Sequence, residues 1–273
     1  MGKPAQPAHR SQEAPVAKQI NPRLKRGLRS GLLFDVRTGA VLWARDPKRI
    51  LPIASLTKMM TALVVTDRAS VSARVLITPD AVRFTGSGVG LLPVGKRVSL
   101  KALLYGLLLV SGNDAAIALA DHLAGTQTRF IAMMNDRARR MRLPCTHFTS
   151  VSGILDLGNH SCAMDLATIA RAVLAQPLLA RVVATRSIIL PFPIKGGKLY
   201  LYNNNPLQLL RYPGIDGVKT GFTDAAGGCL VATARRGHAR LGVVLLHSAD
   251  PPDQAQRLLD AAFARLSGPA LHR

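Results

Sequence analysis

The chain has 273 residues, 48% of them hydrophobic, so it can bury a substantial core as one large domain or as a domain with an inserted subdomain. Lysine and arginine number 36 against 15 aspartate and glutamate residues, which gives a formal net charge of +21. That charge predicts an anionic partner, or else reflects an arginine-rich composition without a dedicated partner. Aromatic residues make up only 4%, and neither zinc-finger spacing nor an RNP motif occurs, so no nucleic-acid partner is expected.

The N-terminal residues 1–29 are polar, basic and rich in proline and alanine, which predicts a disordered basic arm. They contain no apolar stretch of roughly 7–15 residues, so no signal peptide is visible. The longest apolar run, residues 102–110, is too short to span a bilayer, so no membrane anchor is visible either. We expect one domain over residues 30–267 and a short tail over 268–273.

Along this domain, residues 31–36 and 40–44 flank a glycine turn and predict a β-hairpin. The middle, about residues 66–184, has mainly helical periodicity. Strands return from Ile188, and residues 253–266 predict a closing amphipathic helix. Strands near both ends with helices between them predict an α+β fold. Its antiparallel sheet would be built from both chain ends and flanked by helices, beside a mainly helical lobe.

Ser55 and Lys58 form an S-x-x-K pattern. Residues three apart share one face of a helix, so a neutral lysine there can take the proton of the serine hydroxyl and activate it as a nucleophile. The apolar residues 59–65 that follow predict a largely buried helix that begins near the serine. On its own, this pattern is more often an ordinary helix start with a solvated lysine.

Two further motifs follow in the chain. Ser111 and Asn113 lie between two apolar stretches that predict buried helices, which would hold both side chains rigidly in a loop. Lys219-Thr220-Gly221 follows a short glycine-punctuated run that predicts an edge strand beside a ligand. The first two motifs alone are common and the third is rarer, but their order and contexts together predict a single active site for serine acyl transfer.

The motifs and their flanks resemble those of the D-alanyl-D-alanine carboxypeptidases of the low-molecular-weight penicillin-binding protein type, the S11-like serine peptidases. The resemblance extends from about residue 30 to residue 267 and includes residues 52–61, 111–115 and 216–223. It implies a β-lactamase/transpeptidase-like fold, a serine-type carboxypeptidase without metal or cofactor, and a location outside the cytoplasm, in the periplasm or cell wall.

The resemblance also implies roles for three catalytic residues. Ser55 would attack the carbonyl between the two terminal D-alanines of a peptidoglycan stem peptide, and water would hydrolyse the acyl-enzyme. Lys58 would be the base, with a pKa lowered by burial and by the cation of Lys219. Ser111 would pass the proton to the departing amine.

Substrate binding would involve residues of the second and third motifs: Asn113, Lys219, Thr220, Gly221, Phe222 and Thr223. Asn113 would hold the peptide amide, and the backbone N–H groups of Ser55 and Phe222 would form the oxyanion hole. The two threonines would bind the terminal carboxylate. The implied partners are the peptidoglycan stem peptide, β-lactams as covalent inhibitors, and anionic wall polymers that match the charge.

One departure leaves alternatives open. Many relatives place an arginine beyond the last strand, but residues 248–254 contain none, and the next is Arg257. Without it, an endopeptidase acting within cross-links is an alternative. A β-lactamase is another, although class A enzymes need a glutamate for deacylation and this sequence has only Glu13, in the expected arm. A basic wall-binding domain with a dead site is the non-enzymatic alternative.

Histidines and cysteines add little to this interpretation. His147 and His160 invite a Ser-His-Asp hypothesis, but no G-x-S-x-G elbow surrounds any serine. Cys145, Cys162 and Cys229 lack metal-ligand spacing, and we expect each to be a small buried hydrophobe. A Cys145–Cys162 disulfide is the alternative.

Overall fold

The structure, a computed structural model, describes residues 24, 27–90, 92–154 and 157–267. Most of the expected basic arm, residues 1–29, and the expected tail, 268–273, therefore lie outside the described residues. The first strand begins at Leu28, two residues before the expected start of the domain at residue 30.

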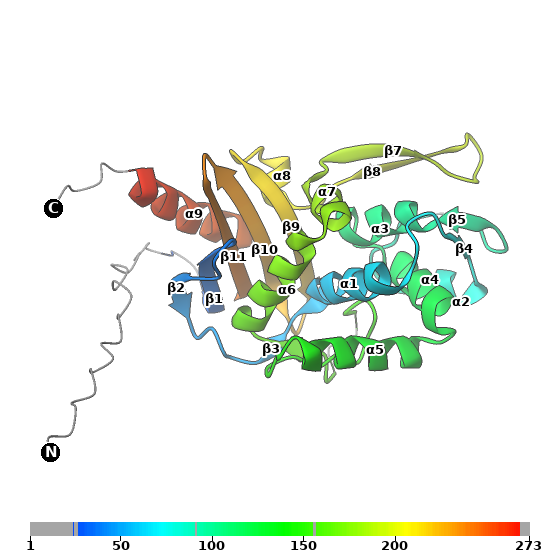
Figure 1. Cartoon of the computed structure of the whole chain (residues 1–273), viewed down its shortest axis with the longest axis horizontal. Coiled ribbons are helices and arrows are strands. Elements are labelled where there is room, and N and C mark those ends of the chain that lie inside the picture. The colour runs from blue at the N-terminus through cyan, green and yellow to red at the C-terminus, as the bar shows by residue number, and fades with distance from the viewer. Residues whose placement is uncertain (1–23, 25–26, 91, 155–156, 268–273) are drawn as a thin grey trace, which may run out of the picture.

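An antiparallel sheet of five strands is built from both ends of the chain (Figure 1), which confirms the expected fold class. The strand order is β2-β1-β11-β10-β9, so the N-terminal hairpin pairs directly with the penultimate element of the chain. This order leaves β9 at one edge of the sheet. The strands are β1 Leu28–Asp35, β2 Val41–Arg45, β9 Ile215–Thr223, β10 Gly227–Arg236 and β11 Ala239–Ser248.

Helices cover both faces of this sheet (Figure 1): α9, Pro251–Ser267, on one side and α6, Ala163–Ala175, on the other. Side chains alternate between the faces along each strand. In β11, Leu245 belongs to the core under α9, whereas Val244 and Leu246 belong to the larger core on the opposite face. The four residues that the periodicity of α9 predicted to face inward are buried: Leu258, Leu259, Ala262 and Phe263.

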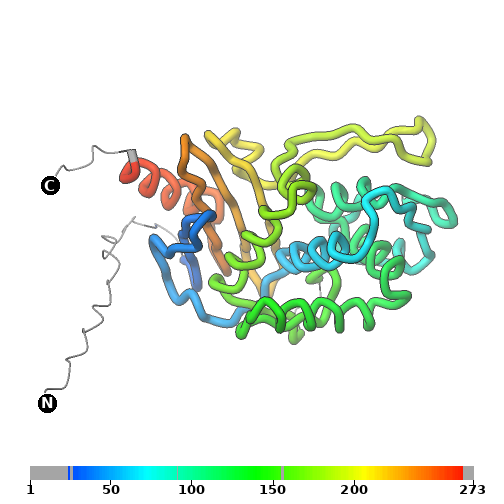
Figure 2. The backbone as a smooth tube through the Cα atoms, in the orientation of Figure 1, coloured from blue at the N-terminus to red at the C-terminus, as the bar shows by residue number. Residues whose placement is uncertain are grey.

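The middle of the chain forms a second, mainly helical lobe, coloured cyan to green in Figure 2. Its central helix, α1 (Lys58–Arg68), is buried from residue 58 to residue 65, and other helices pack around it. No single helix among the described residues is long and apolar enough to cross a membrane, and α6 with α7 passes that test only as a pair bent by 104°. The remaining helices are η1 Ala54–Thr57, α2 Pro79–Val82, α3 Leu100–Leu109, α4 Asn113–Ala124, α5 Gln127–Arg140, α7 Pro177–Ala184 and α8 Pro206–Leu209.

Three short antiparallel pairs complete the described structure. The β7–β8 hairpin extends over the helical lobe (Figure 1), and the other two pairs connect elements around that lobe. Their strands are β3 Leu51–Pro52 with β6 His160–Ser161, β4 Arg74–Leu76 with β5 Arg97–Ser99, and β7 Ser187–Pro191 with β8 Lys198–Tyr202.

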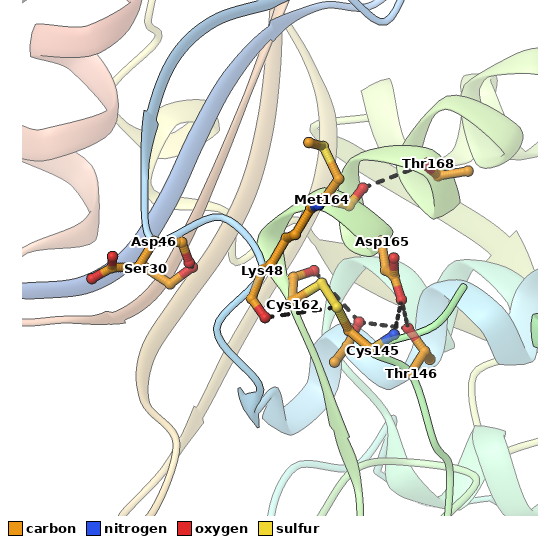
Figure 3. The surroundings of a disulfide bond; sticks show 10 residues. Ser30, Asp46, Lys48, Cys145, Thr146, Cys162, Met164, Asp165 and Thr168 are labelled. Atoms are coloured by element: carbon orange, nitrogen blue, oxygen red, sulfur yellow. Dashed lines mark hydrogen bonds between the residues drawn. A yellow bond between two sulfur atoms is a disulfide. The ribbon is translucent and has the colours of Figure 1, made fainter. Parts of the chain in front are cut away.

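Two of the three cysteines form a disulfide, so the expectation that all three are simple buried hydrophobes is wrong for Cys145 and Cys162 (Figure 3). Asp165 makes a second connection beside the disulfide. Its carboxylate accepts hydrogen bonds from the Cys145 backbone N–H (2.8 Å) and the Thr146 hydroxyl (2.7 Å). The bond ties the loop after α5 to the start of α6. Cys229 is buried, as expected.

Candidate active site

The first motif lies where a short 3-10 turn, η1, leads into α1. Ser55 is on this turn, and α1 begins at Lys58. The Lys58 Nζ atom donates a hydrogen bond to Ser55 Oγ at 2.8 Å. The expected serine–lysine pair is therefore in direct contact.

Lys58 is completely buried, which is rare for a lysine and favours its neutral form. Burial, and then the positive charge of Lys219, lower the pKa of Lys58 well below its ordinary value, while the carboxylate of Asp114 opposes the shift. A deprotonated lysine beside a serine hydroxyl can accept its proton. The contact therefore has the chemistry of an activated nucleophile.

A turn at residues 150–153, which the sequence did not point to, completes the surroundings of Lys58. The Ser152 carbonyl accepts the second hydrogen bond of Lys58 Nζ, at 2.8 Å. The Ser150 hydroxyl accepts hydrogen bonds from the backbone N–H groups of Ser152 (3.2 Å) and Gly153 (3.0 Å), which closes the turn. Gly153 has a φ of +78°, and a Cβ there would lie 1.9 Å from the Ala54 carbonyl oxygen, so only glycine fits against η1.

The second motif presents polar atoms without partners. Ser111 has a φ of +63°, an uncommon conformation for a residue with a Cβ. Within the described residues, Ser111 Oγ and Asn113 Oδ1 are buried and have no hydrogen-bond partner. A buried polar atom left unsatisfied is costly, so both atoms are candidates for bonding to a ligand or a reacting group.

A glycine-rich loop, residues 85–90, is held against the second motif. The Asn113 side chain donates to the Thr85 carbonyl (2.5 Å). Asp114, which is 1% exposed, accepts hydrogen bonds from the backbone N–H groups of Val89 (2.8 Å) and Gly90 (3.3 Å). Burial raises the pKa of Asp114, while these backbone hydrogen bonds act in the opposite direction. In the sequence, the only indication of this contact with the loop is the acidic residue, Asp114, directly after Ser111-Gly112-Asn113.

The third motif lies on edge strand β9, whose ladder with β10 continues from Lys219 to Thr223. Lys219 is 1% exposed and donates from Nζ to the Thr220 carbonyl at 2.9 Å. Burial lowers the pKa of Lys219 to about 7. The Thr220 hydroxyl donates to Asn204 Oδ1 at 3.1 Å, and the Phe222 side chain is 69% exposed.

Gly221 brings the third motif against the first. A Cβ on Gly221 would lie 3.0 Å from the backbone nitrogen of Ser55, and only slightly further from Ala54 Cβ and the Ile53 carbonyl oxygen. The absence of a side chain therefore allows β9 to pass directly beside the Ser55 N–H group. The neighbouring backbone N–H of Phe222 is the other expected member of the oxyanion hole.

A cavity of about 400 Å³ lies beside Thr220 and Phe222 and extends to Ala249 and Pro251, where the sequence lacks the family arginine. None of the described residues that line it carries a charge. Arg257, the first arginine after β11, pairs instead with Asp253 within α9, at 2.7 Å. The positive charge beside this cavity therefore comes from Lys219 of the third motif, not from Arg257.

Known proteins are similar to this chain in sequence. Residues 20–250 match the model of peptidase family S11, described as D-alanyl-D-alanine carboxypeptidase. The D-alanyl-D-alanine carboxypeptidase DacF of Bacillus subtilis is 32% identical over 268 residues, which cover 94% of this chain and 68% of DacF. A D-alanyl-D-alanine endopeptidase of Pseudomonas aeruginosa is 34% identical, over 80% of this chain and 70% of that protein.

The fold leads to the same family. The crystal structure of a D-alanyl-D-alanine carboxypeptidase from Mycobacterium tuberculosis H37Rv matches with a TM-score of 0.85 and 34% identity, over 93% of this chain and 96% of that chain. The chain spans only 60% and 57% of the lengths of two further curated carboxypeptidases. It belongs to peptidase family S11, the D-alanyl-D-alanine carboxypeptidases.

Proposed function

We propose that the chain is a serine-type DD-carboxypeptidase that removes the terminal D-alanine from peptidoglycan stem peptides through an acyl-enzyme. Ser55 Oγ attacks the carbonyl carbon of the penultimate D-alanine while Lys58 Nζ takes the hydroxyl proton. The C–N bond breaks, and the departing amine receives a proton through Ser111. Water then attacks the ester, which restores Ser55 and releases the shortened peptide.

Charge that develops on the carbonyl oxygen is stabilised by the backbone N–H groups of Ser55 and Phe222. The close approach of Gly221 to the Ser55 nitrogen supports this assignment. Asn113 holds the peptide amide of the substrate. Lys219, Thr220 and Thr223 bind the terminal carboxylate.

The observation that carries the proposal is the 2.8 Å contact between Ser55 Oγ and a completely buried Lys58 Nζ. A lysine in a purely structural role would be expected to pair with a carboxylate or to reach solvent. Here its Nζ contacts a hydroxyl and a backbone carbonyl, neither of which is charged.

The direct test is the intact-protein mass after brief exposure to benzylpenicillin, followed over a drug-free chase, in wild type and Ser55→Ala. We expect one long-lived adduct that Ser55→Ala lacks, and release of D-alanine from a synthetic peptide ending in D-Ala-D-Ala. The described residues contain no glutamate, the class A deacylation base, so the adduct should persist. An adduct that clears within seconds would instead favour the β-lactamase alternative. Release of D-alanine by Ser55→Ala would refute the assignment of Ser55 as the nucleophile.

A DD-endopeptidase is the second candidate, and the uncharged cavity beside Thr220 supports it. A substrate that continues beyond the scissile bond needs space there rather than a cation for a terminal carboxylate. Parallel assays on a pentapeptide and on a cross-linked muropeptide dimer separate the two activities. Faster cleavage of the dimer would replace the carboxypeptidase proposal by the endopeptidase.

This substrate places the enzyme outside the cytoplasm, in the periplasm or cell wall. The Cys145–Cys162 disulfide supports that location, since such bonds persist mainly in oxidising compartments. β-Lactams are its expected covalent inhibitors.

A further inference from the structure

A second cavity, of about 380 Å³, lies between the β1–β2 turn, the β10–β11 turn and the last turns of α6. It is on the opposite end of the sheet from the third motif. Gly228 pairs with Phe222 on β9, and Arg235 lies seven residues further along β10, or roughly 23 Å at about 3.3 Å per residue. The polar residues that line the cavity are Arg37, Arg171, Arg235, His238 and Arg240.

Arg171 is held in place by the backbone. Its Nε donates to the Val36 carbonyl (2.9 Å) and its Nη2 to the Arg37 carbonyl (3.1 Å). A Cβ on Gly39 would lie 2.5 Å from Arg171 Nη1, so this glycine makes room for the guanidinium. A guanidinium has five N–H groups, so these two bonds leave three for a ligand. The geometry is that of a pre-positioned anion binder.

The acidic groups near this cavity do not neutralise it. Asp216 pairs with Arg240 at 2.8 Å, and Asp35 in the β1–β2 turn accepts hydrogen bonds from Thr38. The cavity then retains three guanidiniums that, within the described part of the chain, form no ion pair: Arg37, Arg171 and Arg235. Guanidiniums around one cavity repel each other, and a bound anion would reduce that repulsion.

The C-terminal end of α6 opposes the binding of an anion. Ala175, the last residue of α6, also lines the cavity, and a helix C-terminus carries about half a unit of negative charge. Three unpaired guanidiniums outweigh this partial charge. The cavity is therefore electropositive in balance.

We propose that this cavity is a binding site for the phosphate group of an anionic phosphodiester polymer of the cell envelope. The paired N–H groups of an arginine guanidinium match the oxygens of a phosphate, and its positive charge complements the negative charge of the phosphate. A phosphate fills roughly 100 Å³, the space of a few water molecules, so the rest of the cavity can take the flanking polyol units.

A membrane surface fits the cavity less well than a polymer. Lipid binding calls for exposed apolar side chains beside the cations, but Val36 and Leu174, which line this cavity, are buried. Binding a wall polymer here would raise the local concentration of the enzyme at its substrate without any contact to the catalytic serine. The proposal does not depend on which reaction the catalytic site performs.

The test measures binding of a synthetic glycerol phosphate oligomer to the full chain by calorimetry at low and physiological salt. Arg37→Gln/Arg235→Gln removes two exposed guanidiniums of the cavity. Arg129→Gln/Arg186→Gln removes the same charge from exposed positions elsewhere and is the matched control. We expect the cavity variant to bind at least about tenfold more weakly, since one charge-assisted hydrogen bond accounts for roughly that factor. The control should bind like wild type, and inorganic phosphate should compete.

Several results would overturn the proposal. Equal weakening in both double variants would mean that diffuse charge, not this cavity, binds the polymer. Absence of binding by wild type would refute the site. Binding to phosphatidylglycerol vesicles but not to the oligomer would assign the surface to a membrane instead. Both variants should keep the wild-type melting temperature and benzylpenicillin acylation at Ser55, so a failed binding result is separable from a failure of the proposed activity. The single Arg235→Gln variant should show a smaller loss of the same kind.

Discussion

Replacing Gly221 by alanine would test the contact between the first and third motifs. The added Cβ would lie 3.0 Å from the Ser55 nitrogen, 3.1 Å from Ala54 Cβ and 3.1 Å from the Ile53 carbonyl oxygen. Two of these atoms are backbone and the third is a Cβ, so no flexible side chain can move aside. Gly221 has no positive φ, so crowding rather than backbone strain is the perturbation.

The strand must then move away from η1 by a few tenths of an ångström, and with it the backbone N–H of Phe222. If this removes one donor from the oxyanion hole, acylation should slow by about 10²–10³-fold, or roughly 3–4 kcal/mol of transition-state stabilisation. The free energy of unfolding should fall by only about 1–3 kcal/mol, as for other overpacked sites.

The assay is the second-order rate of acylation by a fluorescent penicillin, with thermal melting measured in parallel. Gly27→Ala is the matched control, because a Cβ on Gly27 meets no atom within 4 Å. We expect the control to acylate at the wild-type rate. Wild-type acylation by Gly221→Ala would refute the assignment of this contact to the oxyanion hole.

Three further predictions concern buried lysines and the disulfide. Lys58→Arg should slow acylation by about 10²–10⁴-fold, because a guanidinium keeps its proton, and an unchanged rate would remove Lys58 from the role of base. Burial lowers the pKa of Lys219 from 10.5 to about 7, so between these values the unfolded chain binds a proton that the folded chain does not. The free energy of unfolding should therefore rise with pH in this window by about 1 kcal/mol per unit, and urea titrations of Lys219→Met should show a shallower slope. Serine at both Cys145 and Cys162 should lower the free energy of unfolding by about 3 kcal/mol, given their separation of 17 residues, whereas unchanged urea midpoints would contradict a stabilising disulfide.

The fold could be predicted because its signals are local. The two runs that flank a glycine turn, residues 31–36 and 40–44, and the helical periodicity in 253–266 identified elements at both ends of the chain, and the sheet built from both ends followed from their order. Where a segment lacks such a pattern, the predicted element ended before the observed one. The expected edge strand ended at Lys219, but β9 continues to Thr223, because Thr220 and Gly221 pair with Leu230 and Cys229 of β10.

The parts of the site that the sequence did not reveal depend on contacts between distant residues. The Ser152 carbonyl that bonds to Lys58 lies 94 residues further along the chain, and nothing in a serine-rich loop marks one carbonyl as special. The Cys145–Cys162 pairing needs the loop after α5 to return to α6, which depends on the tertiary fold. The sequence named the candidate catalytic side chains but not the Ser152 carbonyl that bonds to Lys58.

The unfavourable features of the three motifs argue against the dead-site alternative. Ala54 and Ser111 have φ values of +47° and +63°, conformations that cost about 1–3 kcal/mol each in residues with a Cβ. Lys58 and Lys219 are buried, which disfavours their charged forms, and Ser111 Oγ and Asn113 Oδ1 are unsatisfied within the described chain. These residues belong to the three motifs or their immediate neighbours, although positive φ values also occur elsewhere, at Asp46, Arg142, Arg211 and His247. A domain that only binds wall polymers gains nothing from them, since apolar residues at the two lysine positions would stabilise the fold. An acyl-transfer site does require a neutral lysine, unsatisfied polar atoms and a fixed backbone, so catalysis explains all of these costs together.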